Sequence, residues 1–360
     1  MNAPKDAAHS VNSQIVRLGA VQAAPVWLDR QGTLQKVCAL IEEAGDLGIK
    51  ILGFPENFVP GHPAWYYFMP ASARGSRDRA VRLFQEAVEI TDAQLAPVSR
   101  AAKAAGVTVI LGVTEKMPDT TGTMYNTQVV IDANGAIIGK HQKLVATVTE
   151  RLVHGPGAAD TQRTFLTEAG RISALICGEN SNPFAQARIV TDYCCVHVAS
   201  WPGQFSPTMP GGVRENSLLV CRGLAYTCGT FVISSCAINT QEMIADLATN
   251  EDDRRFLEDP QTAGGSCVID PFGKVLAGPL PGDQEGIVYA DADFTDCIRS
   301  RMVHDFAGHY NRPDVYQLRV NRQQPRLVSA FEAPDISHAQ DTVTSSADPR
   351  LGLTRSEKTE

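Results

Sequence analysis

The feature that most constrains the fold is an alternation of short apolar runs with longer amphipathic ones. The apolar runs at 16–23, 50–54 and 107–114 have the length of buried strands. Between them, the segments 28–47 and 79–105 carry apolar residues at helical spacing. Buried strands joined by helices of this length are typical of parallel strands with crossover connections. The first third of the chain therefore predicts an α/β fold.

The middle of the chain adds hairpins, in which two strands pair antiparallel across a tight turn. The clearest joins 125–132 to 136–140 through Asn134-Gly135, and Asn-Gly is a strong hairpin signal. The other predicted elements are hairpins at 164–167 with 171–177 and 265–269 with 274–277, helices at 183–193, 214–228 and 294–306, and strands at 196–200, 231–236 and 286–290. The sheets should therefore contain both parallel and antiparallel strands.

The chain shows no Pro/Gly/Ser-rich linker near its centre, which indicates one domain at 14–323. The flanking segments 1–13 and 324–360 are polar and poor in aromatic residues. Such segments cannot bury enough apolar surface to offset the entropy of ordering, so we expect flexible tails.

Composition excludes several classes of function. The 360 residues are 43% hydrophobic and carry a net charge of −8, whereas nucleic acids and anionic membranes select Lys/Arg-rich surfaces. No apolar run approaches the roughly 20 residues that span a bilayer, and the N-terminus lacks the apolar region of a signal peptide, so we expect a cytoplasmic protein. Nine cysteines without C-x-x-C spacing suggest neither disulfides nor a metal site, and no cofactor motif is present.

Three reactive side chains stand at the ends of predicted strands. Glu56 follows the strand 50–54, Lys143 follows the second strand of the 125–140 hairpin, and Cys177 ends the strand 171–177. Ligands of open α/β sheets usually bind beyond the carboxyl ends of the strands, so these residues can converge. Each one alone is more often structural: a core thiol, a solvated carboxylate or a surface ammonium.

The segments around these residues resemble the nitrilase superfamily of carbon–nitrogen hydrolases. The family's glutamate, lysine and cysteine segments match FPEN, HQKL and ICGEN, which places Glu56, Lys143 and Cys177 in the catalytic positions. Glu150 in VTER matches a second family glutamate. The segment GHYNRPDV is similar to the nitrilase branch in particular. The resemblance implies a four-layer α-β-β-α sandwich, a catalytic domain at 14–323, no cofactor or metal, and homodimers that assemble into larger oligomers or spirals.

The resemblance also implies a mechanism. Cys177 would attack a nitrile carbon to give a thioimidate and then a thioester, which water hydrolyses to the carboxylic acid with loss of ammonia. Glu56 would take and return protons, and a nearby ammonium favours a thiolate. Lys143 and the Gly178 N–H would stabilise negative charge that develops on nitrogen. Glu150 would orient Lys143 or the substrate.

The pocket departs from the common nitrilase pattern at two positions. Gly178 and His154 stand where nitrilases commonly carry aromatic residues, which predicts either a roomier pocket for aryl or arylalkyl substrates or a changed ratio of acid to amide. His154 is expected to be a polar residue at the pocket rim. Glu179 and Asn180 lie close to the thiol, and a structural pairing is favoured for Glu179. Trp201 and the aromatic segment 65–69 could be substrate walls or packing, including an oligomer interface.

Two other functions remain open from the sequence. An amidase of the same superfamily would use the same Cys-Glu-Lys set and thioester chemistry on a carboxamide. A non-catalytic assembly protein with the same fold would show no thiol-dependent hydrolysis. The particular nitrile, the acid-to-amide ratio and the size of the oligomer do not follow from the sequence.

Overall fold

Two six-stranded sheets form the centre of the computed structural model, which describes residues 14–322. The strand order of the first sheet is β12-β1-β2-β3-β4-β5 and that of the second is β11-β10-β9-β8-β7-β6. The first sheet consists of β1 (Ile15–Gln22), β2 (Ile51–Gly53), β3 (Thr108–Lys116), β4 (Met124–Ile131), β5 (Ile137–Gln142) and β12 (Gly286–Asp293). The second consists of β6 (Phe165–Thr167), β7 (Gly170–Ile176), β8 (Val196–Trp201), β9 (Phe231–Cys236), β10 (Cys267–Ile269) and β11 (Val275–Ala277).

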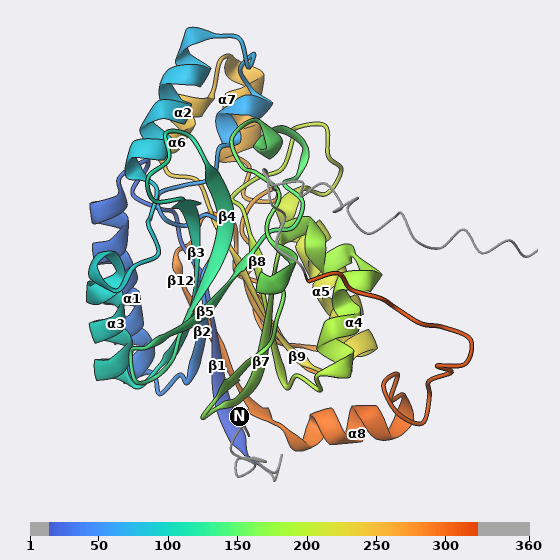
Figure 1. Ribbon diagram of the computed structural model, residues 1–360. Helices are drawn as coiled ribbons and strands as arrows, with labels where there is room; N and C mark the ends of the chain where they lie inside the picture. The colour runs from blue at the N-terminus through green and yellow to red at the C-terminus, as the bar shows by residue number, and fades with distance from the viewer. Residues whose placement is uncertain (1–13, 323–360) are drawn as a thin grey trace, which may run out of the picture. The chain divides into compact units, whose positions relative to one another are not determined.

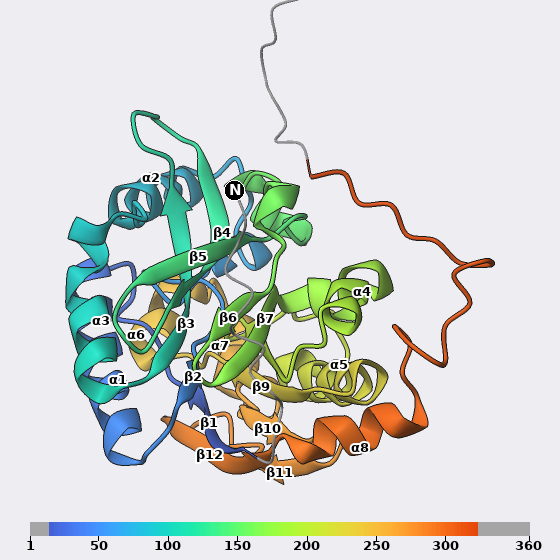
Figure 2. The ribbon, with the colours of Figure 1, turned by 60° about the horizontal axis from the view of Figure 1, so that its bottom comes forward.

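The two sheets share one pairing pattern. In the first sheet, β1, β2 and β3 are parallel, and β12, β4 and β5 add antiparallel pairs at the edges. In the second, β7, β8 and β9 are parallel, and β6, β10 and β11 add antiparallel pairs. The sheets face each other through contacts of β1 and β2 with β9, and the edge strands β11 and β12 lie side by side (Figure 2).

Helices cover the outer face of each sheet (Figure 1). The first sheet is covered by α1 (Arg30–Asp46) and α3 (Asp92–Ala105), and the second by α4 (Pro183–Thr191) and α5 (Gly212–Cys228). The remaining helices are α2 (Arg74–Glu86), α6 (Gln241–Leu247), α7 (Glu251–Glu258) and α8 (Thr295–Val303). The order helix, sheet, sheet, helix confirms the predicted four-layer α-β-β-α sandwich with mixed sheets.

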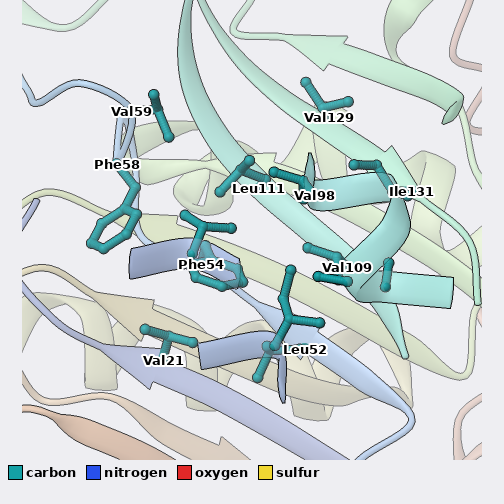
Figure 3. Close-up of a cluster of buried hydrophobic side chains, with 14 of the residues drawn as sticks. Val21, Leu52, Phe54, Phe58, Val59, Val98, Val109, Leu111, Val129 and Ile131 are labelled. Atoms are coloured by element: carbon teal, nitrogen blue, oxygen red, sulfur yellow. The ribbon is translucent and has the colours of Figure 1, made fainter. Parts of the chain in front are cut away.

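Each boundary between layers has its own hydrophobic core. Figure 3 shows the cluster between α3 and the first sheet, where Val98 of the helix packs beside Val109, Leu111 and Val129 of the strands. A second cluster, including Leu18, Ile51 and Ile233, fills the space between the sheets. A third packs α4 and α5 on the second sheet. Strands buried on both faces explain the continuous apolar runs in the sequence.

A fourth cluster joins α2, α6 and α7 at one end of the sheets, at the top of Figure 1. Trp27 and Trp65 pack edge to face at its centre, with ring centroids 6.3 Å apart. Asp246 of α6 accepts hydrogen bonds from the Trp27 indole at 2.8 Å and from Arg79 Nε of α2 at 2.9 Å. This end of the molecule is therefore closed by packed helices and not by loose loops.

The predicted helix at 79–105 was wrong, because the segment forms two helices, α2 and α3. Val88 between them exchanges backbone hydrogen bonds with the end of β3, receiving one from Lys116 and donating one to Thr114. The Thr91 hydroxyl then caps α3 by accepting from the Gln94 N–H at 3.3 Å. A Thr-Asp pair before an apolar helical run is a recognisable N-terminal signal.

The three hairpins predicted in the middle and end of the chain are confirmed as β4–β5, β6–β7 and β10–β11. Helices α6 and α7 were not predicted, although Thr240 and Asn250 cap them as ordinary N-cap residues. Among the cysteines, Cys38 of α1 is half-buried and the other eight are buried. The predicted tails lie outside the described residues. Within the part of the chain that the structure describes, no helix is long and apolar enough to span a bilayer.

Candidate active site

Three charged side chains meet in a buried cluster beyond the strand ends. Lys143 Nζ lies 2.7 Å from Glu56 Oε1 and 2.7 Å from Glu150 Oε2, and each of these residues is 1% exposed. A buried ion pair must recover the free energy that its charges lose on leaving water, through short contacts and further hydrogen bonds. The sequence predicted this convergence from segments 87 and 7 residues apart.

The backbone fixes each of these residues to the sheets. Glu56 follows β2, and its N–H donates to the Trp201 carbonyl at the end of β8 at 3.1 Å, so it joins the two sheets. Lys143 follows β5 directly, and its N–H donates to the Asn126 carbonyl of β4 at 2.8 Å. The cluster is therefore built on rigid strand ends, as a site with defined geometry requires.

Asn126 is a member of the cluster that the sequence analysis missed. Its Nδ2 donates to Glu56 Oε1 at 2.7 Å and to Glu150 Oε1 at 2.6 Å, which ties the two carboxylates together. The signal in the sequence is weak but real: Asn126, Thr127 and Gln128 form a polar run inside a strand that is otherwise apolar, and all three are buried. Buried polar residues in a strand require partners, and here the partners are the site.

The two glutamates have different surroundings. Glu150 accepts from Lys143, Asn126, His154 and the Thr147 N–H, so both its oxygens are satisfied. Glu56 accepts from Lys143 and Asn126 on Oε1 alone, and Oε2 has no hydrogen-bond partner among the described residues. Hydrogen bonds to a carboxylate favour its charged form. The two pKa values are therefore driven apart.

The pKa values follow this asymmetry. Burial raises the pKa of Glu56 to about 7, against the opposing charge of Lys143. Burial also acts to raise the pKa of Glu150, but Lys143 and His154 outweigh it and hold that pKa well below its usual range. Burial lowers the pKa of Lys143, but the two carboxylates outweigh it and raise that pKa well above its ordinary value. Glu56 is thus the group of the cluster that can exchange a proton near neutral pH.

Cys177 lies beside this cluster in a strained backbone conformation. Its φ is +52°, in the left-handed region that non-glycine residues rarely adopt, and such strain is common at functional sites. Burial and the charge of Glu56 raise the pKa of the thiol well above its ordinary value, while Lys143 and the Gly178 N–H act to lower it. Lys143 thus favours the thiolate, in the expected direction, but burial and the Glu56 carboxylate outweigh it.

Framework hydrogen bonds hold the turn that carries Cys177. Asn180 Nδ2 donates to the Cys177 carbonyl at 2.9 Å, and its Oδ1 lies 2.7 Å from His197 Nε2. Glu179 accepts from the backbone N–H groups of Leu144 and Ile176 at 2.7 and 3.1 Å and pairs with a buried histidine, His141. These contacts match the structural role that the sequence analysis favoured for Glu179, and they give Asn180 a similar one.

The other predicted pocket residues are placed differently. His154 is buried and its Nδ1 lies 3.0 Å from Glu150 Oε1, so the expectation of a polar rim residue is wrong. Gly178 is exposed, and a Cβ added there would meet nothing nearer than Thr147 Oγ1 at 3.6 Å. The Trp201 ring is buried in the third core cluster beside Phe205. It reaches the site through its backbone carbonyl.

Two further residues near the cluster come from the segment after Glu56. Tyr67 interacts electrostatically with Cys177 and Glu56, and burial raises the pKa of its hydroxyl well above the ordinary value. His62 interacts with Glu150 and Lys143, and burial lowers its pKa to about 3, so its ring is neutral. Within the aromatic segment, Trp65 is fully buried in the fourth hydrophobic cluster, and Tyr67 is partly buried against the same cluster. Among the described residues, no group of three His, Cys, Asp or Glu side chains could hold a metal ion.

Comparison with known proteins agrees with this geometry. Residues 17–302 match the family model described as carbon-nitrogen hydrolase. The chain belongs to this family, the nitrilase superfamily. The aliphatic nitrilase of Rhodococcus rhodochrous is 31% identical over 329 residues, which cover 91% of this chain and 88% of the relative. The nitrilase of Bacillus sp. is 33% identical over 91% of this chain and 93% of the relative, and the arylacetonitrilase of Aspergillus niger is 32% identical over 85% and 92%.

These matches show that the chain is a hydrolase of the nitrilase type, which was the predicted enzyme class. Solved structures support the fold. Nit3 of Saccharomyces cerevisiae, from branch 10 of the nitrilase superfamily, superposes with a TM-score of 0.64 at 20% identity over 83% of this chain and 97% of that one. A double mutant of the amidase from Nesterenkonia sp. AN1 superposes with a TM-score of 0.56 at 17% identity, over 80% of this chain and 94% of that one. At these identities the structures bear on the fold alone.

Proposed function

We propose that this protein hydrolyses an organic nitrile to the carboxylic acid and ammonia through a covalent bond to Cys177. The observation that carries the proposal is the buried Glu56–Lys143–Glu150 cluster beside a strained thiol. Such a cluster is expensive to build in a protein interior, and it supplies a base, a cation and a nucleophile. The nitrilases among the relatives give independent support for the nitrile as substrate class.

The first step is attack of sulfur on the nitrile carbon. Because the thiol is protonated at rest, Glu56 takes the proton from Cys177 as the C–S bond forms, and the nitrile nitrogen gains the electron pair. Glu56 then gives that proton to the nitrogen, so the product is a neutral thioimidate. Lys143 and the Gly178 N–H stabilise the negative charge on nitrogen during the transfer. Glu150 stays ionised and holds Lys143 in place.

Two water molecules complete the reaction. The first adds to the thioimidate carbon with Glu56 as base, and ammonia leaves once its nitrogen has been protonated, which gives a thioester. The second adds to the thioester carbon, the C–S bond breaks, and the proton that Glu56 removed from water returns to the Cys177 sulfur. The site ends as it began, with one acid and one ammonia formed from one nitrile and two waters.

We propose that Gly178 gives the pocket room for aryl or arylalkyl nitriles. A side chain at this position would point into free space apart from Thr147, so glycine leaves that space to the substrate. Relatives named as an aliphatic nitrilase and as an arylacetonitrilase are similarly related to this chain, so identity alone does not select between these substrates. A panel of aliphatic, arylacetonitrile and benzonitrile substrates measures the preference, and a preference for aliphatic nitriles would contradict it.

The alternative is an amidase of the same superfamily, because a carboxamide forms the same thioester. Incubation with a nitrile and its matching amide, followed by measurement of ammonia, separates the two. The proposal predicts rapid release from the nitrile and slow release from the amide. Release from the amide alone would establish the amidase, and no release by the wild type beyond that of Cys177→Ala would indicate a non-catalytic protein.

We also propose a homodimer that builds larger oligomers, a single catalytic domain at 14–323 and a cytoplasmic location. The support for association is a set of exposed apolar side chains on α4 and α5, including Phe184, Leu219 and Tyr226. A surface that exposes many apolar side chains is typical of a protein–protein interface. All nine cysteines are free, as expected in a reducing compartment. Light scattering on the purified chain measures the assembly, and a monomer at micromolar concentration would contradict it.

A further inference from the structure

Lys143 and Cys177 follow strands of different sheets, so the distance between their reactive atoms depends on how the two sheets are joined. Lys143 follows β5 of the first sheet, and Cys177 follows β7 of the second. Attack of the sulfur on a nitrile beside the ammonium requires both groups at one substrate, and a misplacement of about 1 Å can reduce a rate by up to about 10²-fold. A contact that joins the two segments directly can therefore affect the rate without touching the substrate.

Glu179 makes such a contact with its two carboxylate oxygens. Oε1 accepts a hydrogen bond at 2.7 Å from the N–H of Leu144, the residue after Lys143. Oε2 accepts one at 3.1 Å from the N–H of Ile176, the residue before Cys177. The side chain is buried, so water competes little for these hydrogen bonds. One carboxylate thus holds the backbone beside the ammonium and the backbone beside the thiol.

A third partner, His141, fixes the orientation of this carboxylate. His141 is fully buried, and its Nε2 lies 2.8 Å from Glu179 Oε2. A carboxylate oxygen can only accept, so the imidazole nitrogen that faces it is a donor. Within residues 14–322, every hydrogen bond between the segments 141–144 and 175–181 ends on Glu179. The hydrogen-bonded link between the two segments therefore depends on this side chain.

A simpler role for Glu179 is that of a helix cap. It is the third residue of the 3₁₀-helix Cys177–Ser181, where a glutamate commonly accepts from the N–H of the residue before the helix. That role explains the contact with Ile176. It does not explain the contacts with Leu144 and His141, which lie 35 and 38 residues earlier in the chain. Glu179 therefore does more than begin a short helix.

We propose that Glu179, held by His141, is a positioning residue that sets the distance between the Lys143 ammonium and the Cys177 sulfur. The inference deepens the proposed function and rests on it. Glu179 acts through the backbone of the neighbouring residues and not on the substrate itself. With this distance fixed, the ammonium already lies beside the nitrile nitrogen when the C–S bond forms and negative charge develops there. Loss of the link should therefore slow the attack and leave substrate binding unchanged.

The test removes one of the two acceptors and keeps the shape of the side chain. In Glu179→Gln, the amide oxygen can accept from one backbone N–H while the amide nitrogen faces the other. One segment is therefore released whichever way the amide turns. Glu258→Gln, at an exposed position of α7, is the matched control. His141→Leu and His141→Gln form a second pair, because leucine cannot donate to Glu179 and glutamine can.

Both kcat and KM are measured with the nitrile that the wild type hydrolyses fastest, and kcat is divided by the folded fraction found from thermal unfolding. Glu179→Gln should lower kcat about tenfold and change KM by less than about twofold. Glu258→Gln should change neither. His141→Leu should lower kcat in the same way, and His141→Gln should restore most of it.

An unchanged kcat per folded molecule in Glu179→Gln overturns this inference alone. A rise in KM without a fall in kcat also overturns it, because Glu179 would then act on substrate binding. If Glu179→Gln does not fold, the second pair decides, and a His141→Gln variant no faster than His141→Leu overturns the inference. A wild-type enzyme that releases no ammonia from any nitrile overturns the proposed function, and this inference with it.

Discussion

The segments after β2 and after β7 build the site in two different ways. Each contains a residue in the left-handed conformation just beyond the strand, Asn57 with φ +46° and Cys177 with φ +52°. After β2, the strained residue is the neighbour of Glu56, and asparagine adopts this conformation with little difficulty. After β7, the strained residue is the thiol itself. The two segments therefore place strain on different members of the pair that we propose to react.

The difference shows what each group requires. As the proposed nucleophile, Cys177 must project at one angle, and its strained backbone is held by Asn180 and by the surrounding turn. As the proposed base, Glu56 needs a pKa near the working pH, and burial and the Lys143 charge set that pKa while its backbone conformation stays ordinary. The segment after β7 fixes the direction in which the Cys177 thiol projects, and the segment after β2 places the Glu56 carboxylate where burial sets its pKa.

The largest effect is expected at the thiol. Cys177→Ala should reduce nitrile turnover by at least about 10³-fold, because the proposed covalent intermediate forms on its sulfur. The fold should survive, since the change removes only one sulfur atom, and circular dichroism should match the wild type. Cys38→Ala, at a half-buried thiol of α1, is the control and should keep its activity. Substantial turnover by Cys177→Ala would remove Cys177 from the mechanism.

The base should give the next largest effect and a distinctive pH dependence. Proton transfer from the thiol needs ionised Glu56, whose pKa is about 7, so kcat/KM should fall as the pH drops below about 7. Glu56→Gln should lower kcat by roughly 10²–10⁴-fold and abolish this acidic limb of the profile. Glu43→Gln, at an exposed site, should change neither. An acidic limb that persists in Glu56→Gln belongs to another group.

A smaller effect should follow from loosening the strained turn. Asn180→Asp keeps an oxygen for His197 and loses the N–H that holds the Cys177 carbonyl. A small displacement of a reacting atom can reduce the rate by up to about 10²-fold, so kcat should fall by about tenfold or more with little change in KM. The free energy of unfolding should fall by about 1–3 kcal/mol, since a buried carbonyl loses its partner. If kcat fell and KM rose by the same factor, the substitution would have damaged the substrate pocket instead.

The smallest effect is expected at Gly178. Gly178→Ala should leave the free energy of unfolding within about 0.5 kcal/mol of the wild type, because the position is exposed and the added carbon fits. The hydrogen bond from its N–H should persist. The preference for aryl over small aliphatic nitriles should shrink as the side chain enlarges from Gly178→Ala to Gly178→Phe. A preference that does not depend on this side chain would mean that the substrate lies elsewhere.

The sequence predicted most of the framework because the strands are buried on both faces and the hairpins carry turn residues. The sequence-based prediction failed at 79–105, where the apolar pattern continues across the break between α2 and α3. In that break Val88 bridges to β3, and Thr91 caps the start of α3. The four-layer arrangement came from the resemblance, since periodicity does not say which faces of two sheets meet.

The site was predictable for residues with conspicuous chemistry in matched segments, Glu56, Lys143, Glu150 and Cys177. Asn126 was missed because an amide in a strand looks like an ordinary polar residue until its partners are known. Burial of His154 and the raised pKa of the thiol were also beyond reach, because both depend on what packs around a side chain. The spacing of residues in the sequence does not show which groups pack around a given side chain.

The central claim is that the substrate carbon bonds to Cys177, and the most direct test is to trap that bond. The enzyme is mixed with a ¹³C-labelled nitrile, quenched in acid during turnover and digested with trypsin. The peptide from Ile172 to Arg188 contains Cys177 and no other cysteine. We predict that this peptide alone gains the labelled acyl group. Label on any other cysteine, or turnover with no label on this peptide at any time, would contradict the account.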